Sequence, residues 1–290
     1  MDCHTSSTRT NLRRVTTHFS GNAPDQIHLQ TSDVWTMEEK CISCHQQEYA
    51  RWSASTHSAT YERIFANKEH NQKRQLMDDC LRCHGMHFEG SIDEVVEPLD
   101  TKGPWKLKEA KLAERPSIPC LSCHVVHRNG MPLKKPSQRV GAKEELFRPS
   151  LGLFDRRSRM NMGADILPLP VVYEGERLVK ISPDRRQSLC YQCHAPLSSG
   201  QLGSGDDRTP MGVHEGLSCL GCHEKHSQNT RQSCADCHPR LSNCGIDVEK
   251  MDTTFANPNS KHNIHWVKCI DCHPGGAPKK KTVATAGIGK

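Results

Sequence analysis

Residues 219–238 begin with Cys219-Leu-Gly-Cys222-His223 and, after ten further residues, end with Cys234-Ala-Asp-Cys237-His238. Each half is a Cys-x-x-Cys-His motif, whose two thiols can bond the vinyl groups of a porphyrin while the adjoining histidine binds its iron. The motif occurs seven times, which predicts seven copies of haem c. Its cysteines are Cys41, Cys44, Cys80, Cys83, Cys120, Cys123, Cys190, Cys193, Cys219, Cys222, Cys234, Cys237, Cys269 and Cys272, and the proximal iron ligands that follow are His45, His84, His124, His194, His223, His238 and His273.

Chance does not account for these histidines. Histidine makes up 18 of 290 residues, so it follows a given Cys-x-x-Cys pair by chance in about 6% of cases, and all seven pairs with a probability on the order of one in a billion. Zinc ribbons also use paired Cys-x-x-Cys units, but zinc does not require a histidine directly after each one. The even number of cysteines, 16, also allows a disulfide framework. Only haem attachment explains the histidines.

The composition is poor in residues that build a core. Hydrophobic residues make up 34% of the chain and aromatic residues 5%, and the mean hydropathy is −0.70. Such values are typical of disordered chains, unless a bound group supplies the missing apolar surface. We therefore expect a haem-packed, mainly α fold with much irregular loop and at most one small β-hairpin. The chain without haem should be largely unfolded.

The motifs divide the chain into five predicted segments. They are an extended N-terminal arm (1–32), a three-haem module (33–128), a haem-free insert (129–188), a four-haem module (189–274) and a flexible basic tail (275–290). We expect helices over 33–52 and 57–77, and a hairpin over 170–179 that turns at Glu174-Gly175. The insert is interpreted as a surface excursion or a partner-docking flap, with an active-site lid as the alternative.

The first residues contain half of a further motif. Cys3-His4 would complete an eighth haem site if one more cysteine lay just before Met1. No charged segment followed by an apolar one begins the sequence, so no signal peptide is recognised. One hypothesis covers both features, namely a truncated N-terminus. The alternative is that the Cys3-His4 pair is a coincidence.

The charge pattern gives no sign of nucleic-acid binding. The formal net charge is +6, and the basic residues are scattered apart from Lys279–Lys281. Two propionates on each haem would more than cancel this excess, and the chain lacks a basic patch interleaved with aromatic residues. No run of 18 apolar residues is present, so we predict no transmembrane segment.

The second axial ligand of each iron determines what a haem can do. A haem with two protein ligands transfers electrons, whereas an open position lets small molecules bind and react. Beyond the seven motif histidines, eleven others remain (18 less 7). His87, His127 and His226 each follow a motif histidine by three residues, which on a helix projects a second imidazole toward a neighbouring haem. The predicted distal ligands are His57, His87, His127, His214, His226, His262 and His265, with His18, His28 and His70 as further candidates.

Methionine can also serve as an axial ligand and raises the potential of the iron. The nine methionines recur at no fixed distance from the motifs, so we interpret them as ordinary packing residues. Mostly bis-His ligation and low potentials are therefore expected.

Two segments resemble the multihaem c-type cytochromes. Cys41-Ile-Ser-Cys44-His45, followed by Trp52-Ser-Ala-Ser-Thr-His57, is similar to the opening of the group that contains hydroxylamine oxidoreductase, pentahaem nitrite reductase and the decahaem conduit cytochromes. His214 with Cys219–His223-Glu-Lys-His226 resembles the paired motifs of the conduit and small carrier cytochromes. The resemblance covers about 33–127 and 190–273. It implies export and a periplasmic or extracellular location.

The resemblance has two departures. The nitrite reductases carry a lysine in place of the motif histidine at the catalytic haem, whereas all seven motifs here end in histidine. The cross-linking tyrosine of hydroxylamine oxidoreductase also has no assignable counterpart among the four tyrosines.

The leading interpretation is a non-enzymatic electron carrier. Its redox partners would be a membrane quinol-linked donor and a terminal reductase, other cytochromes or an outer-surface acceptor. One version is a homo-oligomeric conductive filament, in which His18 or His28 ligates a haem of the next subunit. The alternative class is an oxidoreductase that acts on a small nitrogen or sulfur compound at one five-coordinate haem. A haem-binding structural or storage protein is the third interpretation.

Overall fold

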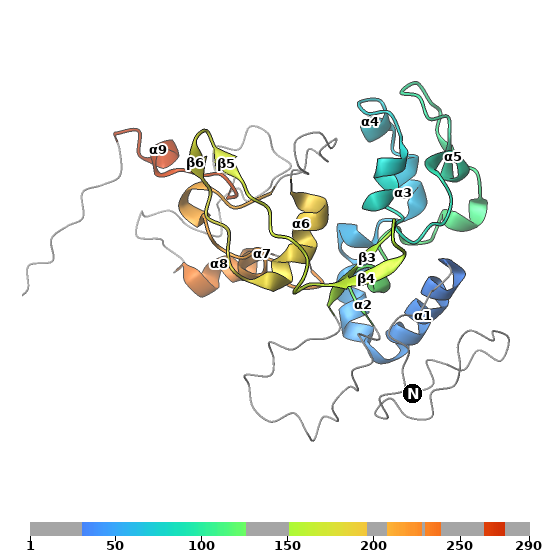
Figure 1. The fold of residues 1–290 in the computed structure, drawn as a ribbon, viewed down its shortest axis with the longest axis horizontal. Helices are drawn as coiled ribbons and strands as arrows, with labels where there is room; N and C mark the ends of the chain where they lie inside the picture. Colours follow the sequence, from blue (N-terminus) through green and yellow to red (C-terminus); the bar gives the residue numbers. More distant parts are fainter. Residues whose placement is uncertain (1–30, 126–150, 196–207, 228–229, 239–263, 276–290) are drawn as a thin grey trace, which may run out of the picture. The chain divides into compact units, whose positions relative to one another are not determined.

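The computed structural model describes residues 31–125, 151–195, 208–227, 230–238 and 264–275. Within these ranges the chain is mainly short helix and irregular loop, as the sequence predicts (Figure 1). The α-helices are α1 (Thr31–Cys44), α2 (Gln46–Ser53), α3 (Tyr61–Phe65), α4 (Lys68–Asn71), α5 (Ile92–Val95), α6 (Ser188–His194), α7 (Cys219–Cys222), α8 (Arg231–Cys237) and α9 (Cys269–Cys272). Short 3₁₀ turns include η1 (Thr56–Ser58), η2 (Asp78–Arg82), η3 (Ala110–Leu112), η4 (Cys120–Ser122), η7 (Arg185–Gln187) and η8 (Gly212–His214).

The described residues contain three two-stranded sheets, where at most one hairpin is predicted. The predicted hairpin is present as β5 (Tyr173–Glu174) paired with β6 (Arg177–Leu178). The other antiparallel pairs are β1 (Val96–Glu97) with β2 (Lys106–Leu107), and β3 (Gly152–Asp155) with β4 (Met160–Gly163). Strands of two to four residues are too short to show the alternation of apolar and polar residues by which a strand is recognised in a sequence.

The first predicted helix, 33–52, is present but divided at His45 into α1 and α2. His45 has φ −107° and ψ 48°. Its backbone N–H still donates to the Cys41 carbonyl at 2.9 Å, and its carbonyl accepts from the N–H of Tyr49 at 3.0 Å. The break therefore changes the direction of the backbone at the motif histidine while the helical hydrogen bonds continue around it.

The second predicted helix, 57–77, is wrong, because the chain forms the short helices α3 and α4 instead. The first ends at Phe65, and Asn67 caps the start of the second, since its side-chain oxygen accepts from the N–H of His70 at 3.0 Å. The buried Asn71 donates from its side chain to the Phe65 carbonyl at 2.7 Å. These asparagine contacts compete with a continuous helix and favour a turn between the two.

The chain forms two compact units, each built from separate stretches of sequence. Unit 1 comprises the described parts of Met1–Leu169, Asp184–Cys193 and His223–Asn229, and unit 2 those of Pro170–Pro183, His194–Cys222 and Thr230–Lys290. Unit 1 has a side-chain core, made of Tyr61, Phe65, Leu76, Leu81, Ile92, Val95, Val96 and Leu112. This core gives part of unit 1 a means of folding that does not depend on a cofactor.

Unit 2 buries far less apolar surface. Its buried hydrophobic residues in the described ranges are Val172, Val179, Ala195 and Val267. Its exposed large hydrophobic residues are more numerous, namely Val171, Tyr173, Leu178, Val213, Leu217, Trp266 and Ile270. A unit with this balance needs another apolar surface to cover its side chains.

Candidate haem-attachment and iron-ligand sites

The described Cys-x-x-Cys-His motifs are all presented by short helical segments, either α or 3₁₀. Each described motif lies on a helical turn or directly after one. In five motifs the N–H of the histidine donates to the carbonyl of the first cysteine, at 2.7–3.0 Å: His45 to Cys41, His84 to Cys80, His124 to Cys120, His238 to Cys234 and His273 to Cys269. Residues three and four positions apart lie on one face of a helical turn. Both thiols can therefore bond to one macrocycle while the imidazole binds its iron.

Thiols of different motifs lie close together in unit 1. The thiols of Cys83 and Cys193 form a hydrogen bond, which together with burial raises the pKa of Cys193 well above its usual value. The sulfur of Cys120 lies 3.6 Å from a carboxylate oxygen of Glu38. Burial and this carboxyl group raise the pKa of Cys120 to about 12. The attachment points of the second and fourth motifs are thus neighbours, an arrangement that suits electron transfer between the groups they would carry.

His226 lies against a motif histidine in unit 1. Its ring centre is 5.9 Å from that of His124, and the two planes are inclined by only 22°. Burial lowers the pKa of His226, while Glu48 acts in the opposite direction. His226 is therefore neutral at physiological pH, the form in which an imidazole binds a metal.

His214 forms a comparable pair in unit 2. Its ring centre is 6.3 Å from that of the motif residue His238, and the planes are nearly perpendicular, at 85°. In the same unit, Cys222 of the preceding motif lies near Cys234 and Cys237, and burial, with these thiols nearby, raises its pKa. The two closely spaced motifs at residues 219–238 thus also have neighbouring thiols in space.

The ring of His214 is held by the backbone of a distant segment. Nδ1 lies 2.8 Å from the carbonyl oxygen of Ile264. Because a carbonyl can only accept, Nδ1 carries the proton and Nε2 keeps the lone pair that a metal needs. Just before His214 in sequence, the N–H of Met211 donates to the His265 carbonyl at 2.6 Å, and that of Val213 to the Val267 carbonyl at 2.9 Å.

Gly212, between these two hydrogen bonds, has φ +66°, and a Cβ atom there would overlap the Val267 carbonyl oxygen. Only glycine combines this left-handed conformation with so close an approach of two backbones. The sequence Gly212-Val-His214 is thus fitted to the segment that holds the imidazole.

Both histidine pairs have the spacing that two imidazoles on one metal require. A metal-bound imidazole nitrogen lies about 2.0 Å from the metal, and the ring centre lies roughly 1.1 Å behind that nitrogen, so ring centres on opposite sides are about 6.2 Å apart. The measured separations of 5.9 and 6.3 Å lie close to this value. By this spacing, His124 with His226, and His238 with His214, are the residues that would hold a haem iron.

His87 is a third predicted ligand in an unusual environment. It is 3% exposed, and its ring stacks on that of Phe154 at 4.1 Å. Neither ring nitrogen makes a hydrogen bond of good geometry, and the contact with the Leu121 backbone is a weak one. Burial and the positive charge of Arg159 lower the pKa of His87 to about 3, against the smaller opposing effect of that contact. A neutral, buried imidazole without a well-formed hydrogen bond is a candidate metal ligand.

The other predicted ligands are placed as follows. His57 is exposed on η1, and His265 lies in the turn that supports His214. The Nδ1 atom of His70 lies 3.1 Å from the side-chain oxygen of Asn71. Outside the described residues lie Cys3, His4, His18, His28, His127 and His262.

Several residues that complete these sites were not predicted. Gly212 and the Ile264 carbonyl support His214, and Phe154 of β3 packs on His87. β3 also runs beside the third motif, since the N–H of Gly152 donates to the Cys123 carbonyl at 3.0 Å. These contacts join residues far apart in the sequence, and no local motif marks them.

Two kinds of feature are absent from the described residues, a metal-binding cluster of side chains and a membrane-spanning helix. No three or more His, Cys, Asp or Glu side chains lie together in a way that could hold a metal ion among themselves. Within the same ranges, no helix combines the length and the apolar character needed to cross a membrane.

Comparison with known protein families gives a match to part of the chain. Residues 40–125 match the family described as cytochrome c554 and c-prime, which covers less than half of the chain. No curated protein and no solved structure matches. The family match supports a c-type cytochrome that binds haem c and transfers electrons. The narrower resemblance to the hydroxylamine oxidoreductase group stays a prediction.

Proposed function

We propose that this chain is a multihaem c-type cytochrome that carries electrons through closely spaced, mostly bis-His, low-potential haems outside the cytoplasmic membrane. The observation that carries the proposal is the pairing of two predicted distal ligands with motif histidines, His226 with His124 and His214 with His238, at 5.9 and 6.3 Å. An iron with two imidazole ligands has no open position for a substrate, which favours electron transfer. The family match over residues 40–125 supports the same cofactor and role.

The residues of the chain have separate tasks in this proposal. The seven motifs hold the haems and supply one axial ligand each. When bound, haem c supplies the one-electron couple of its iron. His214 and His226 supply the second ligand at two irons, and the Ile264 carbonyl fixes the tautomer of His214. The closeness of Cys83 and Cys193 supports short distances between haems.

The proposed setting follows from the chemistry of attachment and from the resemblance. The protein would be periplasmic or extracellular and would exchange electrons with a quinol-linked donor and with a reductase or another cytochrome. A filament would need a ligand from a second copy, for which His18 and His28 are the candidates; both lie outside the described residues.

Low-temperature electron paramagnetic resonance of the oxidised holoprotein tests the proposal, after mass spectrometry has counted the haems. We expect low-spin ferric signals throughout, because every iron has two strong ligands. A high-spin signal near one haem equivalent that shifts on addition of nitrite or hydroxylamine would overturn the carrier proposal in favour of an enzyme with one open iron.

Replacing the two paired histidines tests the ligand assignment itself. We expect His214→Gly and His226→Gly each to convert one haem equivalent to the high-spin form, and the double variant to convert two. Added imidazole should restore the low-spin signal, because it can occupy the vacated position. Low-spin spectra in both single variants, at an unchanged haem count, would remove His214 and His226 from the ligand set.

A further inference from the structure

The hairpin β5–β6 in the haem-free part of the sequence is tied to the loop that carries His214. Arg177 of β6 donates from Nη1 to Oε1 of Glu215, the residue after His214, at 2.8 Å. The same carboxylate oxygen accepts from the backbone N–H of Lys180, also at 2.8 Å. Two contacts from one hairpin therefore converge on the neighbour of a predicted iron ligand.

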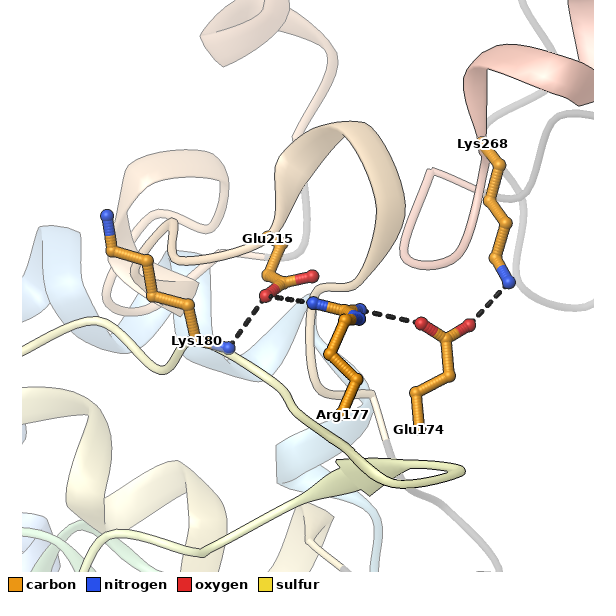
Figure 2. A network of polar contacts seen from close by, with 5 residues as sticks. All are labelled: Glu174, Arg177, Lys180, Glu215 and Lys268. Carbon is orange, nitrogen blue, oxygen red and sulfur yellow. Dashed lines mark hydrogen bonds and ion pairs between the residues drawn. The ribbon is translucent and has the colours of Figure 1, made fainter.

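The other side of the same hairpin is tied to the last haem motif. Nη2 of Arg177 donates to Oε2 of Glu174 at 2.6 Å, and the other oxygen of Glu174 accepts from Nζ of Lys268. Lys268 directly precedes Cys269, and its N–H donates to the side chain of Asp271 in α9 at 2.7 Å. Figure 2 shows Arg177 between the two glutamates, with Lys268 on the far side of Glu174.

These four side chains, Glu174, Arg177, Glu215 and Lys268, form the Arg177 network. Isolated ion pairs on a surface contribute little, because solvent screens them and two long side chains must be ordered. The Arg177 network differs in two ways. The side chain of Glu215 is only 17% exposed, and one guanidinium orders two carboxylates at once. The network also joins segments that are 38 and 94 residues apart in sequence.

The two segments that the Arg177 network joins to the hairpin are also paired directly with each other beside His214. Residues 211–214 pair with the backbone of residues 264–267, and Lys268 continues that second segment. The hairpin contacts the residue after His214 and the residue after the 264–267 segment. Contacts therefore join all three segments pairwise: the hairpin with the loop of His214, that loop with residues 264–267, and the hairpin with Lys268.

We propose that Arg177 is a positioning residue for the iron ligand His214, and that the hairpin β5–β6 couples the haem site at Cys234–His238 to the one at Cys269–His273. Arg177 touches neither iron and acts through Glu215 and Glu174. This inference rests on the proposed function, in which His214 ligates iron. In a six-coordinate haem, a second ligand binds only when the distal imidazole leaves, so the rate of that binding reports how firmly His214 is held.

The experiment measures carbon monoxide binding to the reduced holoprotein of Arg177→Gln by stopped flow, together with the ferric spin state. Loss of two partly exposed charged contacts corresponds to about a three- to tenfold change in an equilibrium. We therefore expect carbon monoxide to bind one haem about three to ten times faster than in the parent protein. Arg177→Lys should give a smaller increase, because an ammonium keeps the charge but cannot bridge both carboxylates in the same geometry.

Arg186→Gln is the matched control. The Arg186 side chain is 49% exposed, against 50% for Arg177, and it also makes charged hydrogen bonds to a carboxylate, that of Asp184. This pair joins residues only two positions apart in sequence, whereas Arg177 joins Glu215, 38 positions away. The control should bind carbon monoxide at the parental rate. Mass spectrometry of each variant confirms an unchanged haem count, so that incomplete maturation is recognised.

The outcomes separate this inference from the proposed function. If His214→Gly makes one haem high-spin but Arg177→Gln binds carbon monoxide at the parental rate, the positioning role is refuted and the electron-carrier proposal stands. If His214→Gly changes no spin state, the ligand assignment fails and the positioning role fails with it. An equal acceleration in Arg177→Gln and Arg186→Gln would show a general charge effect and would also refute the positioning role.

Discussion

Replacing Gly212 with alanine is expected to detach the imidazole of His214 from its iron. Gly212 has φ +66°, and an added Cβ would overlap the Val267 carbonyl oxygen and lie 2.9 Å from its carbon. The two backbone segments would have to move apart to make room. That movement breaks the hydrogen bonds on either side, from Met211 to His265 at 2.6 Å and from Val213 to Val267 at 2.9 Å.

The size of the effect follows from these contacts. An L-residue in the left-handed region costs about 1–2 kcal/mol. Two lost backbone hydrogen bonds cost about 1 kcal/mol each. In the variant, the attached state is therefore destabilised by about 3–4 kcal/mol relative to the state in which the loop has moved away with His214. Since about 1.4 kcal/mol is a tenfold change, the equilibrium between the attached and detached states shifts toward detachment by roughly two to three orders of magnitude relative to the parent protein.

The assay is the ferric spin state, with the haem count as a check on maturation. We expect Gly212→Ala to show one haem equivalent of high-spin iron, restored to low spin by added imidazole. Gly103→Ala is the control, because Gly103 has a similar φ of +69° and an added Cβ there would meet the Trp105 side chain in unit 1. The control carries comparable backbone strain without touching the His214 loop or the β5–β6 hairpin and should stay low-spin.

A fully low-spin Gly212→Ala protein would refute the reasoning, since it would mean that the backbone pairing does not hold the ligand. A high-spin signal of equal size in Gly103→Ala would refute it as well, because backbone strain far from the His214 loop in sequence would then suffice.

Three further predictions concern the core, a buried carboxyl group and the role of haem in folding. Leu81→Ala should lower the free energy of unfolding by about 2–5 kcal/mol, because Leu81 is fully buried and its removal leaves a cavity. The control Ile166→Ala, at a side chain that is 63% exposed, should change this free energy by less than about 0.5 kcal/mol. Denaturant titration measures both. Burial raises the pKa of Glu38 above 4.5. As pH rises through that pKa, the carboxylate becomes charged and stabilises ferric iron nearby, so the reduction potential of that haem falls. Glu38→Gln should remove this pH-dependent fall, which corresponds to on the order of 1 kcal/mol and is measured by redox titration. In the haem-free chain, a protease should cut within 208–222 and 264–275 before it cuts within 61–112, because the buried core of unit 1 protects the latter segment. Equal rates of cleavage in all three segments would contradict this.

The local conformation of the motifs could be predicted from the sequence, but the partners of their histidines could not. A Cys-x-x-Cys-His motif is complete within five residues, and one helical turn suffices to present it. The pairing of His226 with His124 joins positions about a hundred residues apart, and sequence spacing alone cannot choose among the candidate distal histidines. His214 could be named as a ligand because it precedes a motif, but its partner His238 belongs to the next motif along the chain.

Helix boundaries depended on where polar side chains bonded to the backbone. The pattern over 33–52 is interrupted at a single residue, His45, because Thr36 and Ser43 bond to carbonyls four and three residues earlier in the same helix, which leaves the helix intact. Over 57–77, Asn67 and Asn71 form side-chain hydrogen bonds that divide the segment. Both asparagines are visible in the sequence. Their effect depends on whether the side chain faces solvent or backbone, which tertiary packing decides.

The two units imply two different relations between haem and folding. Unit 1 has a core of eight buried hydrophobic residues, so its motifs can be presented on a partly formed scaffold. In unit 2, exposed Val213 and Trp266 lie on the two segments that hold His214, and polar contacts connect those segments. Backbone hydrogen bonds and the Arg177 network can set the direction of this loop but cannot cover its apolar side chains. A haem bound between His214 and His238 would cover such side chains, so in unit 2 the binding energy of haem would also be folding energy. Variants that weaken the polar contacts should therefore lower haem incorporation at Cys234 and Cys237 before they lower it at the motifs of unit 1.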